Sequence, residues 1–154
     1  MTAMARTRSA RPARPARSSR SARSAPYPRA LVAQQLARVR ELCHRLPDVT
    51  ERPSHGSPTF FVGKRTFVMF LDDHHSDGRL AIWCAAPPGV QAQLVEQEPH
   101  RFFRPPYVGH RGWLGVELDK DPDWDEVAAI CADAYRQIAP KRLITALDAG
   151  DGDR

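Results

Sequence analysis

The sequence feature that most constrains the fold is a series of four short runs of strand character in the middle of the chain. The runs lie at about 49–52, 59–62, 66–71 and 80–84. The pairs Gly63-Lys64 and Asp77-Gly78 separate neighbouring runs, and glycine beside a polar residue is typical of tight turns between paired strands. The last run alternates in a way that suits a sheet with one face covered by helices. These runs therefore predict an antiparallel sheet.

Helical patterns lie on both sides of these runs. Apolar residues recur at three- and four-residue spacing from Leu31 to Leu46, and Pro47 ends this first pattern. A second, shorter helix is expected to follow Pro88 and to continue to about Glu98. Both segments supply apolar stripes that can cover one face of the sheet.

The last third of the chain predicts a strand and then the helix with the clearest apolar stripe. Residues 113–118 have strand character. We expect Asp121 to cap the following helix, with Pro122 at its first position and Pro140 at its end. The element order predicts an α+β fold: a two-layer sandwich in which helices pack on one face of an antiparallel sheet.

The N-terminal segment differs in composition from the rest. Residues 1–29 hold eight arginines and no acidic residue, whereas the rest carries the other 15 basic residues against all 18 acidic ones, a balance of −3. We expect residues 1–28 to be disordered, because this Arg/Ala/Ser/Pro-rich stretch has almost no large apolar side chain to bury. The domain is expected over 29–145, followed by a frayed C-terminus over 146–154.

Three interpretations of this basic segment remain open. It is an arm that binds nucleic-acid phosphates, an organellar targeting sequence, or an extension with little constraint on its sequence. Its Ala/Arg/Pro-rich style is typical of a GC-rich bacterial genome, which disfavours organellar targeting.

The sequence predicts a cytoplasmic protein. It contains no apolar run of the roughly 18 residues that a membrane span needs, and no apolar stretch follows the first arginines. The cysteines Cys43, Cys84 and Cys131 are odd in number and lie within apolar patterns. We therefore expect reduced core thiols rather than a disulfide.

Three segments contain residue types that occur in catalytic or metal sites, but their spacing favours loops. The run 72–77 has aspartates and histidines on one tight turn, which cannot surround a metal ion. His55 lies in a turn with serines on both sides, without the oriented base and oxyanion donors that nucleophilic catalysis needs. The run 109–112 lacks the pattern of a phosphate-binding loop. We expect no catalytic residue, no metal and no cofactor.

Basic and aromatic residues near predicted loops remain as candidates for a binding site. If they converge, they can hold phosphates and stack on bases or on another planar ligand. The alternative is that the aromatic residues belong to the core and the cations to an ordinary surface. The candidates are His55, Lys64, Arg65, Tyr107, Arg111, Trp113, Lys141 and Arg142.

From about Leu31 to Leu143 the sequence resembles the MmcQ/YjbR family. The segments that carry the resemblance are 46–49, 55–60, 62–67, 107–113 and 139–143. The resemblance implies a small α+β domain similar to the CyaY type, with a "double wing" associated with DNA binding. It implies no catalytic residues.

Two hypotheses about function follow. In the first, the protein is a non-catalytic bacterial DNA-binding protein, whose basic segment contacts phosphates while the domain is positioned by Lys64, Arg65, Arg111, Lys141 and Arg142. In the second, it binds a small molecule or assists an enzyme, with a pocket around His55, Tyr107, Arg111 and Trp113. A structural role without a ligand is a third possibility. Cations on one open face favour DNA, whereas a cleft lined by Trp113 and His55 favours the pocket.

Overall fold

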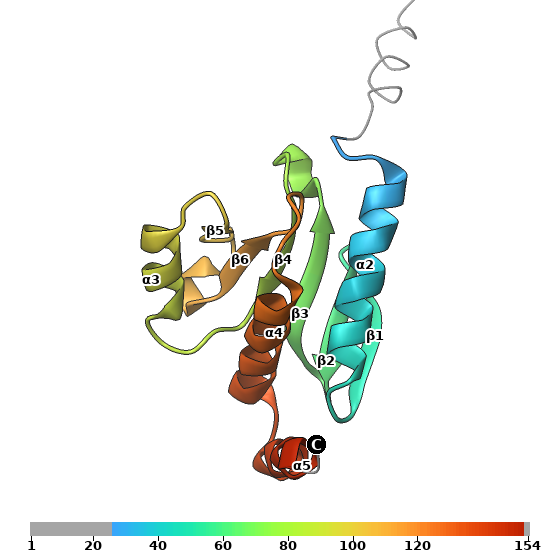
Figure 1. The fold of residues 1–154 in the computed structure, drawn as a ribbon, viewed down its shortest axis with the longest axis vertical. Helices are drawn as coiled ribbons and strands as arrows, with labels where there is room; N and C mark the ends of the chain where they lie inside the picture. Colours follow the sequence, from blue (N-terminus) through green and yellow to red (C-terminus); the bar gives the residue numbers. More distant parts are fainter. Residues whose placement is uncertain (1–25, 153–154) are drawn as a thin grey trace, which may run out of the picture.

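A computed structural model describes residues 26–152 of the chain, with side chains up to residue 150. The described part forms one six-stranded antiparallel sheet with helices packed against it (Figure 1). The predicted α+β class is therefore confirmed. The expectation of disorder over 1–28 falls almost entirely outside the described residues. In chain order the elements are α2 (Arg29–His44), β1 (Val49–Ser54), β2 (Ser57–Val62), β3 (Arg65–Asp72), the 3-10 turn η1 (His74–Ser76), β4 (Leu80–Cys84), α3 (Val90–Gln97), β5 (Phe102–Phe103), the 3-10 turn η2 (Gly109–Arg111), β6 (Leu114–Glu117), α4 (Trp124–Ile138) and α5 (Lys141–Gly152).

The sheet has the strand order β1-β2-β3-β4-β6-β5, with every neighbouring pair antiparallel. The first four strands are joined in sequence, as the four runs of strand character predict. β6 then pairs with β4, and the two-residue β5 lies outside β6 at the edge. The register between β2 and β3 shifts between Phe60 and Phe61. Such bulges bend a strand and increase its local twist.

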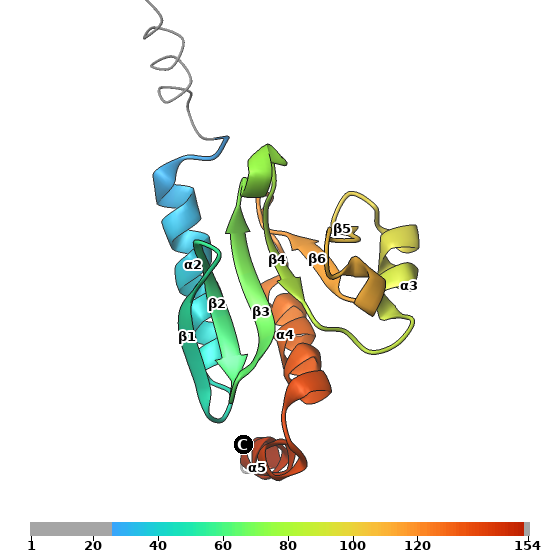
Figure 2. The ribbon, with the colours of Figure 1, turned by 180° about the vertical axis from the view of Figure 1, so that it is seen from behind.

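Helices α2 and α4 cover one face of the sheet, and Figure 2 shows the opposite face, with β1 to β3 in front of α2. On the helical side, the Phe67 ring meets the Tyr135 ring of α4 edge to face, with 5.6 Å between centroids. The three cysteines are buried in this layer and are free, as the sequence predicts. Burial raises the pKa values of Cys43 and Cys84, so these thiols stay protonated and unreactive.

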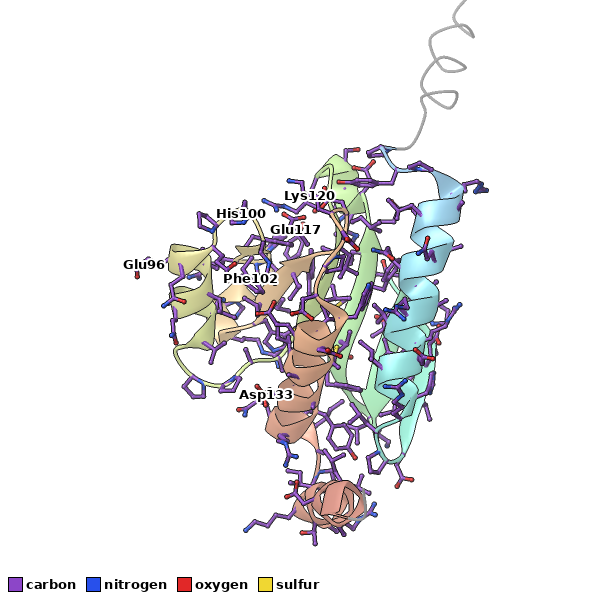
Figure 3. The ribbon with its side chains drawn as sticks, viewed as in Figure 1. Glu96, His100, Phe102, Glu117, Lys120 and Asp133 are labelled. Atoms are coloured by element: carbon purple, nitrogen blue, oxygen red, sulfur yellow. The ribbon has the colours of Figure 1, made fainter. Side chains whose placement is uncertain are left out.

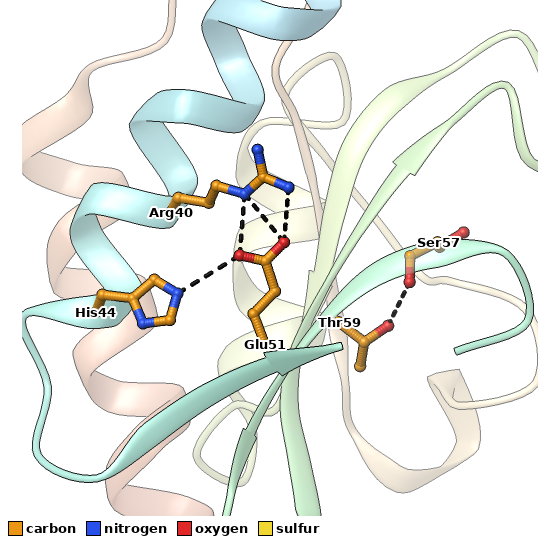
Figure 4. Close-up of polar contacts among 5 residues, drawn as sticks. All are labelled: Arg40, His44, Glu51, Ser57 and Thr59. Atoms are coloured by element: carbon orange, nitrogen blue, oxygen red, sulfur yellow. Dashed lines mark hydrogen bonds and ion pairs between the residues drawn. The ribbon is translucent and has the colours of Figure 1, made fainter. Parts of the chain in front are cut away.

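Polar contacts fix α2 on the sheet. The N–H of Arg40 Nε is shared between the two carboxylate oxygens of Glu51 in β1, at 2.9 Å from each, and Arg40 Nη2 donates to Oε2 at 2.8 Å (Figure 4). His44 Nε2 lies 3.4 Å from Oε1 of the same carboxylate. The bonds from Arg40 lower the pKa of Glu51. The buried amide of Gln35 donates to the Leu118 carbonyl at 2.7 Å. Buried polar groups of α2 thus have partners, as close packing requires.

The start of α4 differs from the expectation. The helix begins at Trp124, and Asp123 rather than Asp121 is its cap, accepting hydrogen bonds from the backbone N–H groups of Asp125 (3.0 Å) and Glu126 (3.3 Å). Aspartates at both 121 and 123 have the right chemistry, so the sequence alone does not distinguish them. The prediction of Asp121 is therefore wrong by two residues.

The end of the chain also differs. Pro140 precedes a further helix, α5, which the sequence analysis misses, and the Pro140 carbonyl accepts hydrogen bonds from Leu143 (2.9 Å) and Ile144 (3.2 Å). Helical backbone continues to Gly152, whereas the sequence predicts a frayed end from residue 146 onward. The buried side chain of Leu143 attaches α5 to the core, below α4 in Figure 1.

Gly115 provides a test of packing at the β5 edge. A Cβ at this position would lie 2.4 Å from carbons of the Phe103 ring, closer than any real contact. Gly115→Ala is therefore expected to lower the free energy of unfolding by about 1–3 kcal/mol in urea denaturation, because the core has no room for the methyl group. The control is Gly150→Ala in α5, where nothing lies within 4 Å. It should leave stability unchanged or slightly raised; equal stability of the two variants would contradict the packing argument.

Candidate functional site

A cavity of about 630 Å³ lies over the face of β3 and β4 that is opposite the helices. Met69 and Trp83 are register partners on these strands, and both line it. Side chains alternate along a strand, so the neighbouring partners Val68 and Cys84 point to the helical side. There the Cys84 thiol interacts with Cys131 of α4. We call this cavity the outer groove; its volume is typical of small-molecule sites.

Four segments build the walls of the outer groove. They are the β1–β2 turn, the β3–β4 loop with η1, the start of β3, and the segment between β5 and β6 that contains η2. The pairing of the strands brings these segments together although they are far apart in sequence. The end of α4 also contributes Ile138.

The outer groove has two chemically different ends. The β1–β2 turn and the β3–β4 loop lie at the same end of the sheet, and they supply His55, His74 and His75. The opposite end, at the start of β3, contains Arg65, and η2 contributes Arg111. Since strands rise about 3.3 Å per residue, the two ends are separated by on the order of 20 Å. We call them the histidine end and the arginine end.

Five of the eight candidate binding residues line the outer groove: His55, Arg65, Tyr107, Arg111 and Trp113. The other three, Lys64, Lys141 and Arg142, lie outside its lining. Arg142 is instead 3.9 Å from Asp48 in an exposed ion pair. The structure thus separates the candidates into a groove set and a surface set.

Sequence reasoning missed three important lining residues, His74, His75 and Trp83. From the sequence alone, the histidines belong to a solvated loop and Trp83 to an alternating strand. A histidine pair directly before a strand that contains a tryptophan was the available signal. The tertiary structure brings the two residue types together, because the ring of His74 lies edge-on to Trp83 with 5.3 Å between centroids.

Three of the six described non-glycine residues with positive φ line the outer groove, whereas Asp48, Asp73 and Ser76 do not. His55 (φ 51°), His75 (φ 52°) and Tyr107 (φ 67°) have left-handed conformations, which side chains rarely adopt. The Tyr107 side chain is also 70% exposed, although it is large and apolar. Such conformations cost about 1–3 kcal/mol each and are typical of functional sites, where the surroundings hold them.

The lining combines aromatic rings with cationic groups. The Arg111 guanidinium lies 5.4 Å from the centroid of the Trp113 ring, within the range of a cation–π contact. The rings of His75 and Tyr107 are 6.2 Å apart. Burial and the neighbouring His75 lower the pKa of His74, which favours its neutral form. In the described part of the chain, neither Arg65 nor Arg111 forms an ion pair.

Trp83 leaves a buried polar group without a partner. Its side chain is 2% exposed, and its indole N–H has no hydrogen-bond acceptor among the described residues. An unpaired buried donor costs about 1–3 kcal/mol. The N–H is closed off from solvent, so this cost belongs to the packed core and the N–H is not exposed to a ligand in the groove.

Groups for metal binding or serine–histidine chemistry do not come together among the described residues of the groove. Between residues 26 and 152, no group of three or more His, Cys, Asp or Glu side chains is placed to hold a metal ion. Within the same residues His55 makes no hydrogen bond to Ser54 or Ser57; the Ser57 carbonyl instead accepts one from Thr59 Oγ1 at 2.9 Å (Figure 4). What the groove offers is stacking surface, positive charge and hydroxyl groups.

A second cavity of about 400 Å³ lies near Glu117, Lys120 and His100, which Figure 3 shows on the side of the sheet toward β5. Its charged residues Glu117, Arg101 and Glu126 are already in ion pairs. Glu117 forms an ion pair with Arg79, and Arg101 bonds Glu98 at 2.7 Å. The pairing indicates a structural role in joining β6 to its neighbours.

Comparison with known proteins shows the family. The YjbR family model matches residues 44–137, and the chain therefore belongs to the YjbR family, in agreement with the resemblance in its sequence. The fold is similar to that of Deinococcus radiodurans protein DR2400, with domain DUF419, at a TM-score of 0.57 and 18% identity over 71% of this chain and 85% of that one. No curated protein matches. Among the described helices, none is both long and apolar enough for a membrane crossing.

Tyr107 offers a test of the strain at the groove. Replacement by alanine keeps the left-handed backbone under strain, whereas glycine adopts it freely. Tyr107→Gly is therefore expected to be more stable than Tyr107→Ala by about 1 kcal/mol in chemical denaturation. At a position without left-handed backbone, alanine is the more stabilising of the two residues. A Tyr107→Ala variant at least as stable as Tyr107→Gly would therefore contradict the claim that the backbone of Tyr107 is strained.

Proposed function

We propose that this protein is a non-catalytic binding protein that holds a small molecule in the outer groove. The observation that carries the proposal is the convergence of five candidate residues from separate segments on one cavity of about 630 Å³. The strained backbone and the exposed ring of Tyr107 support it, because neither contributes to packing. A ligand that covers the ring of Tyr107 explains why this exposed aromatic residue is held in a costly backbone conformation.

Binding is favoured over catalysis by the character of the lining. Noncovalent recognition needs a concave apolar surface with a few polar groups that fix orientation, and the groove supplies both. General acid–base or nucleophilic chemistry needs a base held against its partner. The described hydrogen bonds around the β1–β2 turn connect Thr59 to the backbone of Ser57 instead.

The tryptophans provide a built-in test. Trp83 and Trp113 line the groove, whereas Trp124, the third of the three, lies on α4 with Arg38 5.0 Å from its ring centroid. A thermal-shift screen of metabolites is expected to give hits that shift the indole N–H NMR signals of Trp83 and Trp113 and leave that of Trp124 in place. Tyr107→Ala should weaken these hits about tenfold through lost stacking. A flat screen, or hits that move only the Trp124 signal, would exclude the groove as the binding site.

DNA binding is the second candidate, and the charge of the N-terminal segment favours it. Residues 1–25 contain seven arginines and no acid, enough to attract phosphates without base recognition. The segment joins the domain at the histidine end of the groove, because the Tyr27 hydroxyl donates to the Gly78 carbonyl at 2.6 Å. Lys64, Lys141 and Arg142, outside the groove, are the domain residues available for further phosphate contacts.

A salt titration of duplex DNA binding tests this candidate. The full chain is compared with a chain that starts at Pro26, which keeps the Tyr27 bond to the β3–β4 loop. The full chain should bind at low salt, and its affinity should fall steeply as salt rises, while the shortened chain binds far more weakly. Absence of binding by both chains at low salt would rule out DNA as a partner, and equal binding would assign it to the domain.

A further inference from the structure

The charge of the outer groove narrows the class of ligand. Every ionisable group in its lining other than Tyr107 is a base: the arginines Arg65 and Arg111, and the histidines His55, His74 and His75. No carboxylate lines it, although the chain from residue 30 onward has more acidic than basic residues. The groove is therefore a locally cationic site on an otherwise mildly acidic domain. A cationic groove without carboxylates attracts an anionic ligand, whereas it gives a neutral or cationic ligand no electrostatic gain.

Tyr107 presents an exposed aromatic ring at the groove. This ring lies near His75, whereas Trp83 and Trp113 are 2% and 4% exposed and belong to the core. An exposed ring favours a ligand with a flat ring of its own, because stacking adds about 0.5–1.5 kcal/mol beyond the buried area. A flexible aliphatic anion would contact only the arginines.

From these two observations we infer that the ligand of the outer groove is a compound with a flat ring and a phosphate or carboxylate group. The ring lies against Tyr107, and the anionic group is held at the arginine end by Arg65 and Arg111, which have no competing ion pair in the described structure. Arginine suits this role because its planar guanidinium binds phosphate and carboxylate oxygens in pairs. The inference rests on the proposed groove function and specifies its ligand.

The test uses matched probes that differ only in the anion. Adenosine 5′-monophosphate is compared with adenosine, and indole-3-acetate with its methyl ester, by titration followed through the indole signals of Trp83 and Trp113. Ribose 5-phosphate is the anion without a ring. In at least one pair the anionic probe should bind at least tenfold more tightly than its neutral partner and than ribose 5-phosphate. The two pairs also distinguish a phosphate ligand from a carboxylate ligand.

Substitution of the arginine end locates the anion. Arg65→Met and Arg111→Met are each expected to reduce the preference for the anionic probe at least fivefold, while Lys64→Met, at the neighbouring position outside the lining, leaves it unchanged. The preference is a ratio within one variant, so a change in stability alone does not alter it. Circular dichroism checks that each variant is folded.

The outcomes separate the two proposals. Equal binding within both pairs, a preference that survives both arginine substitutions, or no binding by any anionic probe would each overturn the inference about the ligand. In any of these cases the groove function still stands if the metabolite screen finds compounds that shift Trp83 and Trp113. If no compound in the screen shifts these signals, both the groove function and the inference fail.

Discussion

The antiparallel pairing of β3 with β4 is the constraint on which the rest of this structure depends. It sets Val68 beside Cys84 on one face and Met69 beside Trp83 on the other. The first face is closed by α2 and α4, and the hydrophobic core includes residues of both faces, Trp83 among them. The second is left to line the outer groove. Because side chains alternate along this paired part of β3, a shift of one residue in the register with β4 would exchange the two sets of side chains between the faces.

Unpaired polar groups and left-handed residues occur at the groove and also outside it, since Asp119 Oδ1 is buried without a partner and Asp48 is left-handed away from the groove lining. On the helical face, polar groups have partners: Gln35 bonds the Leu118 carbonyl, and Tyr135 donates to the Pro47 carbonyl at 2.7 Å. On the groove face, Trp83 has an unpaired N–H, and Tyr107 is both exposed and left-handed. A well-packed core supplies the stability that lets a few unfavourable groups persist at one site.

The sequence predicted the fold well where the signal was local. Alternation and turn residues located β1 to β4, and helical spacing located α2 and α4. The sequence did not identify the cap of α4, because Asp121 and Asp123 have the same capping chemistry. It also did not predict α5, a helix that is held by packing against the core. The groove was predicted in part: loop position and residue type nominated Tyr107 and Arg111, but the loop that carries His74 has the composition of any solvated turn.

The sequence by itself determined the α+β class, the strand order of the first four strands, the buried reduced cysteines and the family. These depend on periodicity, turn chemistry and short motifs, which are properties of neighbouring residues. Only the tertiary structure decided which basic residues share a site. It placed Arg65 and Arg111 together in the groove and left Lys64, one residue away, outside it. That choice depends on strand register and loop path, which join residues distant in sequence and leave no mark in any single segment.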